Sequence, residues 1–174
     1  MSGANLALVG LVVVERIVEL VVARRHTRSL FAAGGVEHGR SHYPFMVALH
    51  AGLLLGCFLE PIVAARPFES IRFAAGAAIV IAAEGLRWWT IATLGGRWTT
   101  RVVVLPGRPL VTGGPFRLMR HPNYLAVAIE VAALPLAVGA WVTALAGTLL
   151  NGILLLAVRI PSEEAALGVG IRPR

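Results

Sequence analysis

The stretch Gly113–Tyr124 reads Gly-Gly-Pro-Phe-Arg-Leu-Met-Arg-His-Pro-Asn-Tyr and leads directly into a long apolar run. Pro122 fits the first position of a helix, where its missing N–H would have no intrahelical partner, and His121 before it is restricted to extended backbone. The pattern therefore predicts a helix that begins at Pro122, with Arg120 and His121 at its positive end, where an anionic group would be attracted. The alternative is that the arginines of this stretch only anchor the chain to lipid headgroups.

The composition predicts an integral membrane protein. The 174 residues are 57% hydrophobic and 14% charged, with a mean hydropathy of +0.76. This is far more apolar than a soluble domain of that length. The net charge of +7 comes from arginines that lie mostly between apolar runs, as in the loops of membrane proteins, and not from a patch suited to nucleic acid.

Five apolar runs are each about long enough to cross a bilayer as a helix. They cover residues 5–23, 43–65, 71–94, 123–138 and 141–158. The N-terminus lacks a cleavable signal pattern, so we expect the first run to be retained. The arginine distribution predicts an outside N-terminus and an inside C-terminus. We expect a single all-α membrane domain over residues 1–174, with its catalytic half over 95–174.

Several charges interrupt the apolar runs. Glu15 and Glu19 share one helical face with Arg16 beside them, and Glu84 and Arg87 have the spacing of an ion pair. Charges at this depth must face protein or water, so they would pair with one another or with an arginine on a neighbouring helix. An interhelical polar clamp is favoured over a catalytic role.

The last two apolar runs are joined at Gly139-Ala140 with no charge at the turn, which predicts a membrane helical hairpin. A hairpin brings its two ends to the same face of the membrane. The chain leaves the second run at Arg159, and Ser162 is a plausible N-cap for a short helix after it. Before the hairpin, the run Val102–Val104 predicts a short strand or an extended segment.

The hairpin places two polar clusters together in a pocket at the membrane surface. They are Arg120, His121 and Tyr124 at its entrance and Arg159, Glu163 and Glu164 at its exit. Arginine suits a carboxylate, glutamate suits an amine or ribose hydroxyls, and aromatic faces suit a sulfonium or a base, so a zwitterionic cofactor would fit. The alternative is that these residues cap and anchor helix ends. No HExxH, Walker or GxGxxG pattern is present, and the five histidines have no metal-ligand spacing, so no metal is expected.

These motifs resemble the isoprenylcysteine carboxyl methyltransferase family of membrane methyltransferases. The family pattern is Gly-Pro-aromatic-Arg, then Arg-His-Pro-x-Tyr, a hydrophobic hairpin, and Arg-Ile-x-x-Glu-Glu-x-x-Leu. Here these elements are 114–117, 120–124 and 159–167. Similarity to the bacterial branch extends upstream over nearly the whole chain. That branch resembles the small methyltransferases associated with type III polyketide synthases, which methylate a ring hydroxyl of alkylpyrones or alkylresorcinols.

The resemblance implies a cytoplasm-facing site that binds S-adenosylmethionine, releases S-adenosylhomocysteine and takes a lipophilic acceptor from the bilayer. By analogy, the cofactor-binding residues are His121, Pro122, Tyr124, Arg159, Glu163 and Glu164. The same analogy makes Arg120, Glu163, Glu164 and His50 the catalytic candidates, with the proton acceptor left open among Glu163, Glu164, His50 and His121. From the residues alone, a buried, hydrogen-bonded histidine is favoured for His50 over a role in catalysis or substrate binding. Relatives often continue into a longer tail beyond Leu167, so closure over the cofactor is in question for this chain.

Three alternatives remain. The first is a sterol-type membrane reductase, since those enzymes share a similar Arg-His-Pro-x-Tyr turn. Such reductases are expected to bind a nicotinamide cofactor with motifs that contain aspartate, and this sequence contains no aspartate. Methylation of a prenylcysteine carboxylate is the alternative within the methyltransferases. A membrane protein without catalytic activity is the third. The sequence does not indicate the oligomeric state; membrane lipids are the other expected partners.

Overall fold

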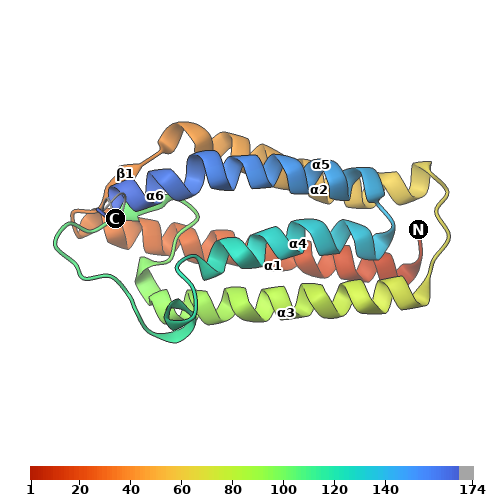
Figure 1. Cartoon of the computed structure of the whole chain (residues 1–174), viewed down its shortest axis with the longest axis horizontal. Helices are drawn as coiled ribbons and strands as arrows, with labels where there is room; N and C mark the ends of the chain where they lie inside the picture. The colour runs from red at the N-terminus through yellow and green to blue at the C-terminus, as the bar shows by residue number, and fades with distance from the viewer. Residues whose placement is uncertain (169–174) are drawn as a thin grey trace, which may run out of the picture.

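Long helices lying side by side make up most of the chain, with a small sheet at one end of the bundle (Figure 1). The computed structural model describes residues 1–168, so the question of a longer C-terminal tail lies outside the described residues. The helices are α1 (Gly3–Ala32), α2 (Tyr43–Val63), α3 (Ser70–Leu94), α4 (Pro122–Val138), α5 (Trp141–Ile153) and α6 (Ile160–Ala166). Short 3-10 turns occupy Arg40–His42, Gly95–Arg97 and Gly114–Arg117. The all-α class is therefore largely confirmed.

Within residues 1–168, three helical segments are long and apolar enough to cross a membrane: Arg40–Val63, Ser70–Arg97 and Trp141–Ala166. The apolar helix α4 is shorter, with 17 residues. In α1 the three charges Glu15, Arg16 and Glu19 interrupt the apolar sequence. An integral membrane protein is thus supported, whereas five spans remain a prediction.

Helix α4 lies at the centre of the bundle, packed mainly against α3 and α5. Apart from its first turn and Glu130 it is apolar on all sides, as expected for a helix surrounded by protein, and Ala126 and Leu134 are fully buried. Its contact with α3 is close because Gly76 has no side chain: a Cβ built there would lie only 2.5 Å from the Cβ of Ala137. The predicted helical hairpin is confirmed as α4 and α5.

The second arm of the hairpin differs from the prediction. Helix α5 continues without a break through the π-helical turn η4 (Leu154–Arg159) into α6. The prediction that Ser162 caps a new helix is wrong, because Ser162 lies inside α6 and its backbone is already helical. The start of α4 at Pro122 is as predicted, with His121 in a non-helical conformation before it.

The first helix is also longer than predicted. It runs to Ala32, through the arginine-rich stretch 24–28 beyond the predicted apolar run 5–23. Arginine is a good helix former and no glycine or proline interrupts the stretch, so the helix continues past its apolar part and ends just before Gly34.

A two-stranded antiparallel sheet closes this end of the bundle. Strand β1 (Val36–His38) pairs with β2 (Val102–Val104), with Glu37 opposite Val103. The sequence predicted either a short strand or an extended segment for Val102–Val104, and the structure shows a strand. A hydrogen bond of 3.2 Å from Nη1 of Arg101 to Glu37 ties the two loops together at the sheet.

The charges within the helices form the predicted interhelical clamp. The guanidinium of Arg16 hydrogen-bonds to Glu19 in the same helix and to Glu84 on α3. Nη2 of Arg87, also on α3, donates to Glu130 on α4 over 2.5 Å. The bundle is therefore joined across α1, α3 and α4 by buried ion pairs.

Candidate active site

A cavity of about 390 Å³ lies at the end of the bundle that carries the sheet. Its walls come from the C-terminus of α1, the whole segment between α3 and α4, the start of α4, and the end of the η4–α6 helix. Volumes in this range are typical of sites for small ligands. The cavity is therefore built from parts of the chain that are far apart in sequence.

The two ends of the hairpin meet at this cavity. Nε2 of His121 lies 3.0 Å from Oε1 of Glu164, and the Tyr124 hydroxyl donates a hydrogen bond to Glu163. Nδ1 of His121 is 4.0 Å from Oε1 of Glu163. The predicted proximity of these two polar clusters is confirmed, since both lie on the same side of the bundle.

The rings of His121 and Tyr124 form one face of the site. Their centroids are 5.5 Å apart and their planes differ by 24°, which is a stacked arrangement. The start of the helix at Pro122 produces it, because His121 directly precedes the helix and Tyr124 lies in its first turn. Tyr124 is buried, whereas the His121 side chain retains 21% exposure and can be reached from the cavity.

Arg159 connects three separate segments of the site. Its Nε donates to the Tyr124 hydroxyl over 3.0 Å, Nη2 donates to the carbonyl of Thr100 over 3.0 Å, and Nη1 lies 3.4 Å from Nε2 of His42. Arg159 is only 4% exposed, so these contacts compensate for removing its charge from water. Arg159 therefore lines the cavity and also holds Tyr124, Thr100 and His42 in position around it.

Arg120 also lines the cavity, but it is exposed and forms neither a hydrogen bond nor an ion pair with any of residues 1–168. A guanidinium in this position is available to an anionic group of a ligand. The cavity wall thus contains a guanidinium group without a partner among residues 1–168. It also contains the carboxylates of Glu164 and Glu163, which are oriented by His121 and Tyr124.

His50 does not line the cavity. It lies in α2, where Nδ1 is 2.7 Å from the carbonyl oxygen of Met46 one turn earlier. This is the arrangement expected for a hydrogen-bonded helical histidine. The structure gives His50 no contact with the other candidate residues.

Sequence reasoning missed much of the cavity wall. Strand β2, the following loop and Trp98 all contribute, and the loop residues Leu110 and Phe116 add apolar surface. Their position depends on the pairing of β2 with β1, which brings together segments more than 60 residues apart. The arginines and glycines of this stretch indicated a loop outside the bilayer. No pattern in it predicts that the loop packs over the cavity.

Taken together, the fold and the site define a helical bundle with a cavity at one end and, among residues 1–168, three helices long and apolar enough to cross a membrane. Comparison with known proteins identifies its kind. Residues 76–169, which include α4 to α6 and the cavity-lining loop, match the isoprenylcysteine carboxyl methyltransferase family. The chain belongs to this family, whose members are membrane methyltransferases that use S-adenosylmethionine.

Two bacterial relatives match over most of their length. A protein of Bacillus subtilis (strain 168), named uncharacterized protein YpbQ, is 34% identical over 160 residues, which cover 92% of this chain and 94% of that protein. An uncharacterized protein of Haemophilus influenzae is 31% identical over 153 residues, covering 87% and 88%. No solved structure matches the chain significantly.

The residues of the cavity are compatible with S-adenosylmethionine. Arg120 offers a cation for a carboxylate, and Glu163 and Glu164 offer anions for an ammonium group or for hydroxyls. The stacked rings of His121 and Tyr124 offer an aromatic surface for a sulfonium or a base. The fit rests on charge complementarity together with the volume of the cavity.

Proposed function

We propose that the protein is an S-adenosylmethionine-dependent O-methyltransferase that acts on a lipophilic acceptor, with the cofactor held in the cavity at the start of α4. One observation carries the proposal. The hairpin joins His121 to Glu164 and Tyr124 to Glu163 at the wall of a single cavity, and these residues fall within the segment that matches the family.

In this proposal each polar group of the cofactor is bound by a different residue or pair of residues in the cavity wall. Arg120 binds the carboxylate, and Glu163 and Glu164 bind the ammonium group or the ribose hydroxyls. The rings of His121 and Tyr124 face the sulfonium or the base, and Pro122 begins the helix whose N-terminus contributes its positive end.

When bound, S-adenosylmethionine supplies an electrophilic methyl group. The chain then has to hold the acceptor oxygen in line with that group and exclude water, so most of the rate enhancement would come from positioning. Arg159 contributes indirectly, because its hydrogen bonds to Tyr124 and to Thr100 hold the helix end against the loop before β2.

A hydroxyl acceptor must lose its proton during transfer. We assign this proton to His121, because its Nε2 is paired with Glu164 at 3.0 Å and the carboxylate would stabilise the imidazolium that forms. Glu163 is engaged by Tyr124, and His50 does not line the cavity.

The acceptor proposed is a ring hydroxyl of an alkylpyrone or alkylresorcinol that enters from the bilayer. Aliphatic side chains of β2 and the loop after it, together with Leu30 and Phe116, give the cavity a largely apolar wall suited to an alkyl chain. The protein would lie in the bacterial inner membrane, with the cavity facing the cytoplasm.

A prenylcysteine carboxylate is the second candidate acceptor. The family description names this activity, and five arginines in the cavity wall outnumber two glutamates: Arg97, Arg101, Arg108, Arg120 and Arg159 against Glu163 and Glu164. An excess of cations favours an acceptor that is already anionic and needs no base.

Two measurements test the proposal. Purified protein should gain thermal stability from S-adenosylhomocysteine and not from NADPH, because only a ligand of the folded state shifts the unfolding midpoint. Membranes containing the protein should transfer a labelled methyl group to one member of a panel of alkylpyrones, alkylresorcinols and prenylcysteines. Stabilisation by NADPH alone would instead assign a reductase, and no response to either ligand would assign a protein without catalytic activity.

A further inference from the structure

Six charged side chains meet in the middle of the bundle, away from the cavity at its end. They come from three helices: Glu15, Arg16 and Glu19 from α1, Glu84 and Arg87 from α3, and Glu130 from α4. Four carboxylates face only two guanidinium groups. If all are ionised, the cluster carries a formal charge of −2 in a region without bulk water, which is costly unless a further cation is present.

The hydrogen bonds of the cluster leave a specific set of oxygens free. Arg16 contacts one carboxylate oxygen each of Glu15, Glu19 and Glu84. Oε1 of Glu15, Oε1 of Glu19 and Oε2 of Glu84 are buried and have no hydrogen-bond partner among residues 1–168, and Oε2 of Glu15 meets Arg16 only as an ion pair. So many unpartnered acceptors in one place exceed what a buried site normally tolerates.

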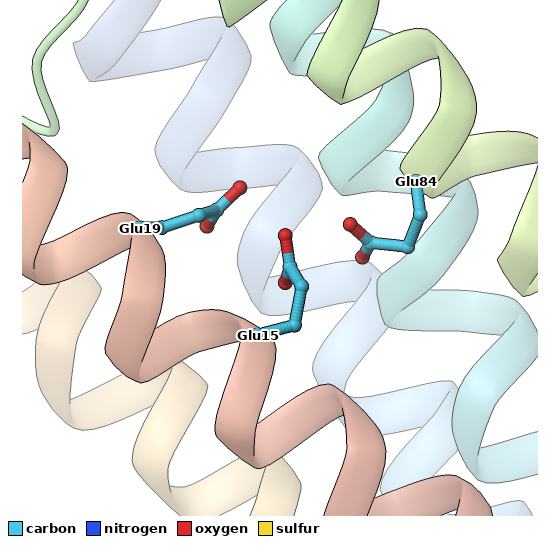
Figure 2. Close-up of side chains that lie close together, drawn as sticks. All are labelled: Glu15, Glu19 and Glu84. Carbon is cyan, nitrogen blue, oxygen red and sulfur yellow. The ribbon is translucent and has the colours of Figure 1, made fainter.

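The three carboxylates point toward one another across the gap between α1 and α3 (Figure 2). One oxygen from each lies within 4.8 Å of the others. Glu19 is the most deeply placed, since it is only 3% exposed, and its unpartnered oxygen cannot be satisfied by bulk solvent. This arrangement is suited to a cation that contacts all three residues.

A second, smaller cavity adjoins the cluster. It measures about 200 Å³ and is lined by Glu15 and Glu84 and otherwise by aliphatic side chains of α1 and α3, such as Val12 and Val80. The wall is almost entirely apolar, so this cavity leaves space beside Glu15 and Glu84 but adds no further ligands, and the coordination of an ion must come from the carboxylates and from water held by them.

We propose that Glu15, Glu19 and Glu84 bind a hard divalent cation such as Mg²⁺, Ca²⁺ or Mn²⁺. Carboxylate oxygens are the ligands these ions prefer, and one divalent ion balances the excess charge that the two arginines leave. The site is distinct from the larger cavity, because Glu19 and the cavity residue Leu30 are separated by 11 residues of α1, or about 16 Å along the helix. The ion therefore has a structural role in joining α1 to α3.

The test uses the full-length protein purified in detergent, stripped with EDTA and then titrated separately with MgCl₂, CaCl₂ and MnCl₂ at constant ionic strength. We expect one bound divalent ion per chain by elemental analysis. The unfolding midpoint should rise by about 5 to 10 °C at a hundredfold excess over Kd, whereas NaCl should not raise it. The readout does not involve methyl transfer, so it is independent of the proposed function.

Variants separate this site from a general effect of ions. Glu15→Gln should weaken the response at least tenfold, and it is the mildest change because Glu15 has one ion-pair partner among residues 1–168, Arg16, whereas Glu19 and Glu84 have two each. Glu69→Gln, an exposed carboxylate beside Arg72 outside the cluster, is the matched control and should keep the full response. The proposal is overturned if stripped protein takes up no divalent ion, or if Glu15→Gln binds it as wild type does. A midpoint that falls with rising pH and ignores metals would show that protons balance the charge instead.

Discussion

Nε2 of His121 lies 3.0 Å from Oε1 of Glu164, although 43 residues and a complete helical hairpin separate them in the chain. The pairing exists because α4 leaves this end of the bundle and the α5–η4–α6 helix returns to it. A polar contact between two helix ends could be purely structural. Its position at the wall of the larger cavity is what connects it to the proposed chemistry.

We predict that His121→Ala and Glu164→Ala each lower the rate of methyl transfer by about 10²-fold or more, because each removes half of the proton-accepting pair. Both variants should remain folded, since His121 and Glu164 retain partial exposure and lie at the end of the bundle. Initial rates with labelled S-adenosylmethionine measure the effect.

Glu69→Ala is the control for these variants, because its carboxylate is exposed and pairs only with Arg72. It should transfer methyl groups at the wild-type rate. Wild-type turnover in His121→Ala or Glu164→Ala would remove both residues from the catalytic assignment.

A second prediction concerns Arg159. Arg159→Lys keeps the charge but cannot reach Tyr124, Thr100 and His42 at once, because an ammonium group lacks the planar spread of a guanidinium. We expect a loss of about 2 kcal/mol in unfolding free energy and a smaller stabilisation by S-adenosylhomocysteine. Thermal unfolding with and without that ligand measures both effects.

The neighbouring Arg120 provides the contrast. Arg120→Lys alters an exposed side chain with no partner among the described residues, so it should weaken ligand binding without lowering the unfolding midpoint of the free protein. If Arg159→Lys also weakened ligand binding without lowering the unfolding midpoint of the free protein, the assignment of a positioning role to Arg159 would be wrong.

Local sequence signals were sufficient for the helices that form the hairpin. Pro122 set the start of α4, and the uncharged Gly139-Ala140 turn set its end, where Gly139 adopts a left-handed conformation with φ of 83°. The closeness of His121 and Glu164 followed from this topology, because the helix that returns from the Gly139-Ala140 turn runs back to the level at which α4 begins.

Contacts across long sequence distances were not predictable in this way. The partner of β2 is β1, and His42 reaches Arg159 over 117 residues, but neither pairing has a local pattern. The cluster in the bundle is an intermediate case. The charges within the apolar runs predicted an interhelical clamp, but the convergence of Glu84 with the carboxylates of α1 depends on how two helices pack.

A third prediction concerns Glu60, whose carboxylate acts as an N-cap for another helix. It accepts hydrogen bonds from the backbone N–H groups of Val142 and Thr143 at 2.9 and 2.8 Å, at the start of α5 where Ala140 offers no capping side chain. Glu60→Ala should cost about 1 to 2 kcal/mol of unfolding free energy, the usual cost of losing an N-cap. Glu60→Gln should lose less, because one amide oxygen can still accept.

Methyl transfer by folded Glu60→Ala protein should be unchanged, since Glu60 does not line the larger cavity. Thermal unfolding of the two variants beside wild type measures the difference. Equal midpoints for all three proteins would show that the cap contributes nothing to the α2–α5 contact.

The final prediction is the orientation of the bundle in the membrane. Five spans would place the N-terminus outside and the larger cavity inside, because the arginine-rich loops that line it favour the cytoplasm. In a Cys57→Ser background, Arg108→Cys at the cavity and Ser2→Cys at the N-terminus provide one label on each side. An impermeant maleimide should modify Ser2→Cys in spheroplasts and Arg108→Cys only in inverted vesicles. Labelling of both from the same side would mean an even number of crossings, and α1, with its three internal charges, would then be the helix that does not cross.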